Sequence, residues 1–176
     1  HYIFLEYFII EEGKFWDSIL EVLIQKAKEG VDVRLLYDDF GCLNTLPTNY
    51  DKKLRKLGIK CEKVNKIRPI LDIRVNNRDH RKILVIDGYI GFTGGINIAD
   101  EYINEKTRFG VWKDNCIMLE GEGVSGLTNL FLSMWIMENN EKQDIVIDNY
   151  IPNKYINEYY KISSKGYIQP YGSFPF

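Results

Sequence analysis

A histidine and a lysine two residues apart are the first candidates for chemistry in this sequence. His80 and Lys82 stand in the stretch "DHRKILVID", and the only other histidine is His1. The β-branched apolar run after Lys82 predicts a strand, whose alternate side chains project from one face. His80 and Lys82 can therefore meet one ligand such as a phosphate, because a neutral imidazole can attack phosphorus and an ammonium group stabilises the charge that develops on the oxygens. A bare His-x-Lys pair is, however, more often a strand cap beside a solvated lysine.

A glycine pair and an asparagine follow the expected strand. The stretch "GFTGGINIAD" places Gly94, Gly95 and Asn97 at a turn where the backbone can approach a ligand closely. Glycines alone suit an ordinary hairpin equally well. Asp87 lies five residues after Lys82 and so projects from the opposite face, where it can fix the end of the strand.

Taken together, these residues resemble the HKD signature of the phospholipase D superfamily. The stretch "HRKILVIDGYIGFTGGIN" contains His-x-Lys, four residues, Asp, six residues and Gly-Gly-x-Asn, with Gly-Gly where many members have Gly-Ser. Most of residues 1–138 resembles the first half of bacterial cardiolipin synthases, in the blocks "LEYFII", "KAKEGVDVRLLYDDFG", "NNRDHRKILVIDG", "GFTGGINIADEY" and "WKDNCIMLEGEGV". The stretch "GYIQPYG" resembles the opening of that family's second half.

The resemblance implies catalytic roles for four side chains. His80 would be the nucleophile that forms a covalent phosphohistidine, while Lys82 and Asn97, with the main chain at Gly95, would bind the phosphate. Asp114 in "WKD" would accept a hydrogen bond from the other ring nitrogen of His80 and so fix its tautomer. The alternative for Asp114 is a solvated strand end.

Three further residues are expected to shape the site without reacting. Asp87, Gly94 and Gly95 are assigned structural roles there, Gly95 in addition to its main-chain role in phosphate binding. Asn115 and Cys116 stand where the family generally has Thr and His, which leaves open any polar contact at that place.

No metal or other cofactor is expected. A metal-assisted phosphodiester reaction needs a cluster of carboxylates or histidines around the ion. The paired Asp38 and Asp39 do not define such a cluster, since aspartates at a strand end are more often helix caps or solvated groups. The resembled family also works without a metal.

Alternating strand and helix signals predict the fold. The apolar residues 2–10, the helical stripe in "FWDSILEVLIQKAKEG" and the strand "VDVRLLYDD" make a βαβ-type unit. A short helix around residues 49–57 and the strand "IKCEKV" follow, then the hairpin of "KILVID" with "YIGFTG", the strand "NCIMLEG" and a helix in "VSGLTNLFLSMWIMENN". We expect an α/β fold with a mixed, largely parallel central sheet and helices on both faces.

The chain is expected to be a piece of a longer protein, because it begins with His1 directly on an apolar stretch. Residues 1–139 would form a first phospholipase D-like catalytic half, residues 140–166 a linker or surface excursion, and residues 167–176 the start of a truncated second half. The resembled enzymes need a second HKD half, from the same chain or from a homodimer mate. The isolated piece is therefore expected to be inactive or very slow.

Composition limits the partners and the compartment. A net charge of −2 gives no broad attraction for a polyanion, so no nucleic acid is expected. The three cysteines show no C-x-x-C pairing, which indicates neither a disulfide framework nor a structural zinc site. No apolar run reaches the roughly 18 residues that cross a bilayer. We expect this piece to be soluble, and the resemblance places the full-length protein at the bacterial cytoplasmic membrane through helices upstream.

The function expected from the resemblance is phosphatidyl transfer. One phosphatidylglycerol would donate its phosphatidyl group to the hydroxyl of another, giving cardiolipin and glycerol. A hydrolytic phospholipase D-type phosphodiesterase or nuclease, with water as acceptor, is the alternative within the superfamily. A non-catalytic lipid-binding or regulatory module is the alternative of another class, and in each lipid case the ligand is phosphatidylglycerol or another phospholipid.

Overall fold

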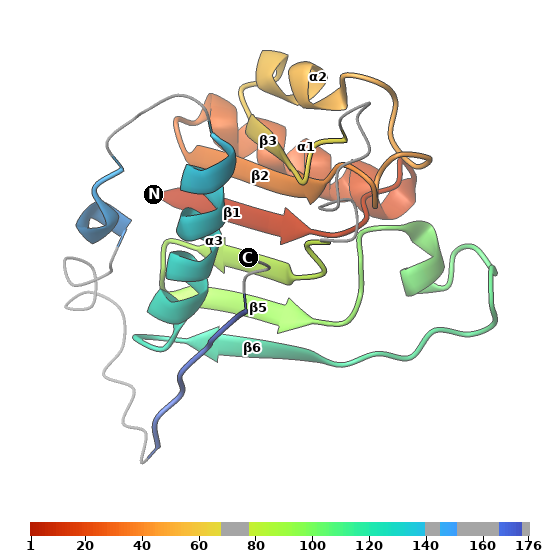
Figure 1. Ribbon diagram of the computed structural model, residues 1–176. Helices are drawn as coiled ribbons and strands as arrows, with labels where there is room; N and C mark the ends of the chain where they lie inside the picture. The colour runs from red at the N-terminus through yellow and green to blue at the C-terminus, as the bar shows by residue number, and fades with distance from the viewer. Residues whose placement is uncertain (68–77, 140–144, 151–165, 174–176) are drawn as a thin grey trace.

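A mixed sheet lies at the centre of the molecule in a computed structural model that describes residues 1–67, 78–139, 145–150 and 166–173 (Figure 1). Within these ranges the strands are β1 (Tyr2–Tyr7), β2 (Asp32–Asp38), β3 (Lys60–Val64), β4 (Lys82–Ile86), β5 (Ile90–Gly94) and β6 (Cys116–Glu120). The helices are α1 (Lys14–Lys28), α2 (Tyr50–Lys56) and α3 (Val124–Glu138), with short 3₁₀ turns η2 (Asp100–Ile103) and η3 (Ile147–Tyr150).

The six strands of the described chain have the order β3-β2-β1-β4-β5-β6. The pairs β1/β2 and β2/β3 are parallel, while β1/β4, β4/β5 and β5/β6 are antiparallel. The expected mixed α/β sheet is therefore confirmed, although its parallel share is smaller than expected. Parallel neighbours require a crossover, and among the described elements only α1 and α2 connect successive parallel strands.

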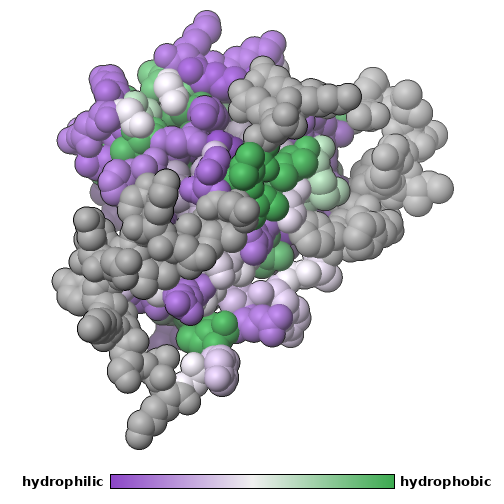
Figure 2. Space-filling view, turned by 90° about the vertical axis from the view of Figure 1, so that its left-hand side faces the viewer, coloured by the Kyte–Doolittle hydropathy of each residue, from purple (hydrophilic) through white to green (hydrophobic). Residues whose placement is uncertain are grey.

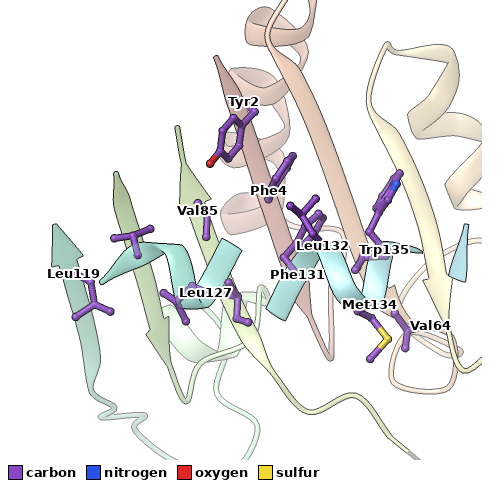
Figure 3. Packing of buried hydrophobic residues seen from close by; sticks show 13 residues of the cluster. Tyr2, Phe4, Val64, Val85, Leu119, Leu127, Phe131, Leu132, Met134 and Trp135 are labelled. Atoms are coloured by element: carbon purple, nitrogen blue, oxygen red, sulfur yellow. The ribbon is translucent and has the colours of Figure 1, made fainter. Parts of the chain in front are cut away.

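Helices cover both faces of the sheet, as expected. On one face, α1 and α2 bury Trp16 and Leu54 against the β2 residues Val33 and Leu35. On the other face, α3 crosses the strands (Figure 1). Figure 3 shows its side chains meeting those of the sheet, and the ring of Phe131 stacks on that of Phe4 with centroids 4.5 Å apart.

The N-terminus of α1 is tied to the segment that follows β5. The Asp100 carboxylate accepts hydrogen bonds from the backbone N–H groups of Lys14 (3.1 Å) and Phe15 (2.8 Å). A carboxylate satisfies free N–H groups at a helix start and interacts favourably with the helix dipole. The bond joins residues more than eighty positions apart and fixes the segment after β5 against α1.

Part of the expected linker packs on the sheet. Tyr2 donates a 2.6 Å hydrogen bond from its hydroxyl to the Tyr150 carbonyl oxygen, and Ile145 lies against the core under α3. Residues 140–144 and 151–165 of that linker, and residues 174–176 of the expected second half, lie outside the described residues. The division at residues 139 and 166 stays a prediction.

The described surface on the side of η3 and α3 is mainly hydrophilic, and its apolar areas are small and separate (Figure 2). Within the described ranges, each helix falls short of the length and apolar character needed to cross a membrane.

Candidate functional site

The start of β4 and the ends of its neighbours bring the predicted catalytic residues to one edge of the sheet, while Asp87 lies at the other end of β4. Because β4 is antiparallel to both β1 and β5, its first residue Lys82 lies beside Tyr7 at the end of β1, and the next residue, Ile83, pairs with Thr93 near the end of β5. Gly94, the last residue of β5, pairs with Cys116, the first of β6. His80, Gly95 and Asp114 follow or precede these strand ends, so all come to the same edge.

His80 and Lys82 are in direct contact. The Lys82 Nζ atom lies 3.1 Å from His80 Nδ1 and donates a 2.6 Å hydrogen bond to the His80 carbonyl oxygen. Partial desolvation, followed by the charge of Lys82, lowers the pKa of His80 below its ordinary value. Burial also lowers the pKa of Lys82, to about 8, against the opposing charges of Asp79 and Asp114. At neutral pH the pair is therefore a neutral imidazole beside an ammonium group.

Phe8 lies beneath this pair and was not singled out from the sequence. Its ring centroid is 4.9 Å from that of His80, and Lys82 Nζ is 5.4 Å from the Phe8 centroid. The aromatic ring desolvates both groups on one side and offers its negative face to the ammonium. An aromatic residue at the end of an apolar strand gives no sequence signal for such a position.

Asn97 is almost fully buried, with 3% of its surface exposed. Its Oδ1 accepts a hydrogen bond from the Ile9 N–H (3.1 Å), and its Nδ2 donates to the Tyr102 hydroxyl (2.8 Å). The side chain therefore holds the segment after β1 against η2. One amide hydrogen remains for a ligand once these two bonds are made.

Asp114 is an exposed residue whose carboxylate lies over the backbone of Gly95. A Cβ atom built on Gly95 would be 2.5 Å from both Asp114 oxygens, so this approach requires glycine. Asp114 Oδ1 accepts a 2.6 Å hydrogen bond from the Asn115 N–H. Among the described contacts the His80 ring meets Lys82 and Phe8 and makes no hydrogen bond with Asp114. The proposed acceptor role of Asp114 stays a prediction.

Asp87 and Gly94 have structural surroundings. Asp87 adopts a positive φ of 53° just after β4, at the end opposite His80. Its carboxylate accepts a 2.7 Å hydrogen bond from the Tyr2 N–H and lies 2.8 Å from His1 Nδ1, so it fixes the start of β1. A Cβ atom on Gly94 would be 2.5 Å from the Asn115 carbonyl oxygen, which explains glycine at the β5–β6 pairing.

Buried acidic residues behind His80 were missed from the sequence. Glu6 and Asp79 are 0% and 4% exposed, and Arg81 bridges them through 2.8 Å contacts to Glu6 Oε1 and Asp79 Oδ1. Burial, followed by the charge of Asp79, raises the pKa of Glu6 well above its ordinary value. The period-two pattern indicates which face a strand residue occupies, but it cannot show that a glutamate finds an acidic and a basic partner there.

Asp38 was considered from the sequence as a cap or solvated group; it is fully buried at the end of β2, so the solvated alternative is wrong, and its Oδ1 caps the turn that follows. Its neighbour Asp39 is ion-paired to Lys63 at 2.9 Å. The described residues contain no group of three or more His, Cys, Asp or Glu side chains arranged to hold a metal ion.

Comparison with known proteins identifies the family. The family model described as cardiolipin synthase, phospholipase D-like domain, matches residues 2–135. The chain belongs to this family. It is 48% identical over 174 residues to an uncharacterized protein of Streptococcus mutans, covering 99% of this chain and 36% of that protein. It is 43% identical over 142 residues to cardiolipin synthase 2 of Bacillus cereus, covering 80% of this chain and 27% of that enzyme.

The family's fold agrees with solved structures. Nuc of Salmonella typhimurium, a phospholipase D family member, matches 78% of this chain and 80% of its own with a TM-score of 0.57 at 17% identity. NucT of Helicobacter pylori matches 76% of this chain and 78% of its own with a TM-score of 0.55 at 15% identity. At these identities the likeness concerns the fold alone. The chain spans about a quarter to a third of the curated relatives it matches.

Proposed function

We propose that this chain is the first catalytic half of a phosphatidyltransferase that joins two phosphatidylglycerol molecules into cardiolipin and releases glycerol. The supporting observation is the contact of a neutral imidazole with a charged ammonium at the sheet edge, in a chain that belongs to the cardiolipin synthase family. Phosphodiester chemistry without a metal needs such a pair, since the nucleophile must be uncharged while the oxygens of the phosphate need a cation.

In the first step His80 attacks the phosphorus of phosphatidylglycerol. A nitrogen–phosphorus bond forms, and the bond from phosphorus to the glycerol oxygen breaks. Attack by Nε2 requires the proton on Nδ1, which the neighbouring ammonium disfavours. Bound phosphate attracts Lys82 away from Nδ1, and Asp114 then accepts the Nδ1–H bond. Asn97 contributes its remaining amide hydrogen, and Gly95 its main chain, to the phosphate oxygens.

In the second step the hydroxyl of another phosphatidylglycerol attacks the phosphohistidine. A phosphorus–oxygen bond forms, the nitrogen–phosphorus bond breaks, and cardiolipin leaves. Each step needs a proton donor or acceptor opposite His80, and such help is worth roughly 10² to 10⁴ in rate. A second HKD half, from a longer chain or from a homodimer mate, supplies it in this proposal. The chain on its own is then inactive or very slow.

Labelled phosphatidylglycerol tests the proposal with the protein in its natural full length. In vesicles of this lipid we expect cardiolipin and glycerol, with the protein recovered at the bacterial cytoplasmic membrane. Phosphatidic acid would instead identify a hydrolytic phospholipase D, and absence of any product would favour a non-catalytic lipid-binding module. A DNA substrate serves as the comparison for a nuclease, which the net charge of −2 disfavours.

Replacement of His80 by Ala should abolish turnover and the acid-labile phosphoprotein that a brief reaction with phosphorus-labelled lipid leaves behind. Lys26→Ala is the matched control, because Lys26 lies in the last turn of α1 and its described partner is Glu29. Full activity of the His80→Ala protein would refute the covalent mechanism.

A further inference from the structure

Asp38 is a buried carboxylate whose four hydrogen bonds all come from N–H donors. Its Oδ1 accepts from the backbone N–H groups of Phe40 (3.0 Å) and Gly41 (2.9 Å). Its Oδ2 accepts from Asn65 Nδ2 (3.1 Å) and from the backbone N–H of Asp79 (2.9 Å). Two N–H donors on each oxygen fill the acceptor positions of the carboxylate.

The two oxygens serve different purposes. The bonds to Oδ1 close a local turn of the kind that aspartate commonly forms after a strand. The bonds to Oδ2 join residues 27 and 41 positions away, at the end of β3 and just before His80. The local turn therefore accounts for the bonds to Oδ1. The bonds to Oδ2 hold distant segments, one of which carries His80.

That segment carries His80 outside the sheet ladder. β4 begins at Lys82, so strand pairing does not fix the main chain at His80. Asp79, immediately before it, is held by Asp38 through its N–H and by Arg81 through its carboxylate, with Arg81 Nε 2.8 Å from Asp79 Oδ1. His80 is thus the exposed residue between two anchored neighbours.

We propose that Asp38 is a positioning residue, which fixes the His80 imidazole for attack on phosphorus by holding the main chain of Asp79. This rests on the proposed function, in which His80 is the nucleophile. A displacement of about 1 Å in a reacting group can cost about 10²-fold in rate, so loss of the anchor should act on the chemical step. The Asp38 charge also raises the pKa of His80 against the effect of burial.

Asp38→Asn tests the anchor. The amide oxygen can still accept from the local turn, whereas the amide hydrogens then face the N–H of Asp79 and the anchoring bond is lost. We expect kcat for cardiolipin formation to fall about 100-fold with KM changed less than about threefold. Asn65→Ala is the matched control, since it removes one bond to Oδ2 and leaves the Asp79 bond in place. Its kcat should stay within about threefold of the parent.

A second readout does not depend on turnover. Diethylpyrocarbonate acylates a histidine only when its imidazole is neutral, and the carbethoxylated His80 in its peptide reports the pH at which this modification is half-maximal. Asp38→Asn should move that pH lower, because a negative charge near the imidazole is removed, and Asn65→Ala should leave it unchanged. If the parent makes no cardiolipin, the proposed function fails, while this titration still decides whether Asp38 governs the state of His80.

Two results would overturn the positioning role. One is an Asp38→Asn protein with parental kcat and an unshifted His80 titration. The other is an Asn65→Ala protein that loses as much kcat as Asp38→Asn, which would indicate general loosening of the turn. If Asp38→Asn fails to fold, Asp38→Ser retains a hydroxyl acceptor for the local turn and is subjected to the same two measurements.

Discussion

The ammonium nitrogen of Lys82 lies 3.1 Å from Nδ1 of His80 and is also bonded, at 2.6 Å, to the carbonyl oxygen of that same histidine. The imidazole and the ammonium, each of which can carry a positive charge, are thus held in contact by the bond from Lys82 to the His80 carbonyl oxygen. Because each charge disfavours protonation of the other group, simultaneous charging is costly, and burial adds to that cost. The arrangement favours the protonation states that phosphoryl transfer to histidine requires.

A bell-shaped pH profile follows for kcat/KM. The nucleophile must be neutral, and its lowered pKa places the acid limb below the ordinary histidine value of about 6.5. Lys82 must be protonated, and its pKa of about 8 places the alkaline limb near that pH. Lys82→Arg should retain measurable activity and lose the alkaline limb, because guanidinium stays protonated. The rate measured from pH 5 to 10 checks this, and an unchanged alkaline limb in Lys82→Arg would assign that limb to another group.

Gly95→Ala should reduce activity by displacing Asp114. The new Cβ would be 2.5 Å from both carboxylate oxygens, so the carboxylate must move. The Asp114 charge raises the pKa of Lys82 against the effect of burial, and its displacement should shift the alkaline limb to lower pH. Asp114→Asn should shift the limb in the same direction, and both variants should lose roughly 10-fold or more in kcat.

Gly123→Ala is the control for that substitution. It lies just before α3, where an added Cβ would meet the nearest atom at an ordinary 3.4 Å. Its pH profile should match the parent. A Gly95→Ala protein whose alkaline limb coincides with that of Gly123→Ala would show that Asp114 does not act on Lys82.

Glu6→Gln should stabilise the protein at neutral pH. The pKa of Glu6 is raised in the fold, so above about pH 4.5 the unfolded chain releases a proton that the folded chain retains. The Glu6 contribution is most favourable at low pH and is lost as pH rises towards the raised folded pKa. A glutamine imitates the protonated acid, since its oxygen can accept from Arg81 and its amide can donate to Asp79.

Urea unfolding at several pH values measures this effect. The free energy of unfolding of Glu6→Gln should exceed that of the parent by an amount that grows as the pH rises above about 4.5 towards the raised folded pKa of Glu6. Glu21→Gln, which removes an exposed carboxylate on α1, provides the comparison. A Glu6→Gln protein that is less stable than the parent at pH 8 would mean that the ion pair with Arg81, 2.8 Å long, outweighs the cost of burying the charge.

The fold could be predicted from the sequence because its elements carry strong local signals. The apolar run of residues 2–10 and the helical stripe that follows predicted the β1–α1–β2 unit, and Gly88 between two apolar stretches predicted the β4–β5 hairpin, which the structure confirms. The balance of parallel and antiparallel pairing was less predictable. The position of β4 beside β1 depends on packing between segments far apart in the chain, for which a single sequence contains no local signal.

The site was predictable only where spacing is specific. The His-x-Lys spacing predicted that the two side chains can meet, and they do, although β4 begins at Lys82 and His80 lies just outside the strand. The burial of Asp38 and Glu6 was not predictable, because an isolated acidic residue in a sequence normally indicates a solvated side chain. Asp38 receives two of its four hydrogen bonds from distant segments, and Glu6 meets Arg81, which lies just before β4, so the partners of both carboxylates appear only in three dimensions.

Phe131→Ala should destabilise the fold without a specific effect on catalysis. The Phe131 side chain is fully buried between α3 and the sheet and stacks on Phe4 at 4.5 Å (Figure 3). Loss of a buried phenylalanine leaves a cavity and typically costs about 3–5 kcal/mol of unfolding free energy. Met137→Ala, on the same helix but 62% exposed, should cost less than about 1 kcal/mol. Urea unfolding gives both values, and the folded fraction of Phe131→Ala should keep the parental pH profile. The profile should not change because Phe131 contacts the core beneath β1 and β4 rather than the sheet edge. A changed alkaline limb would show that packing under α3 affects the pKa of Lys82.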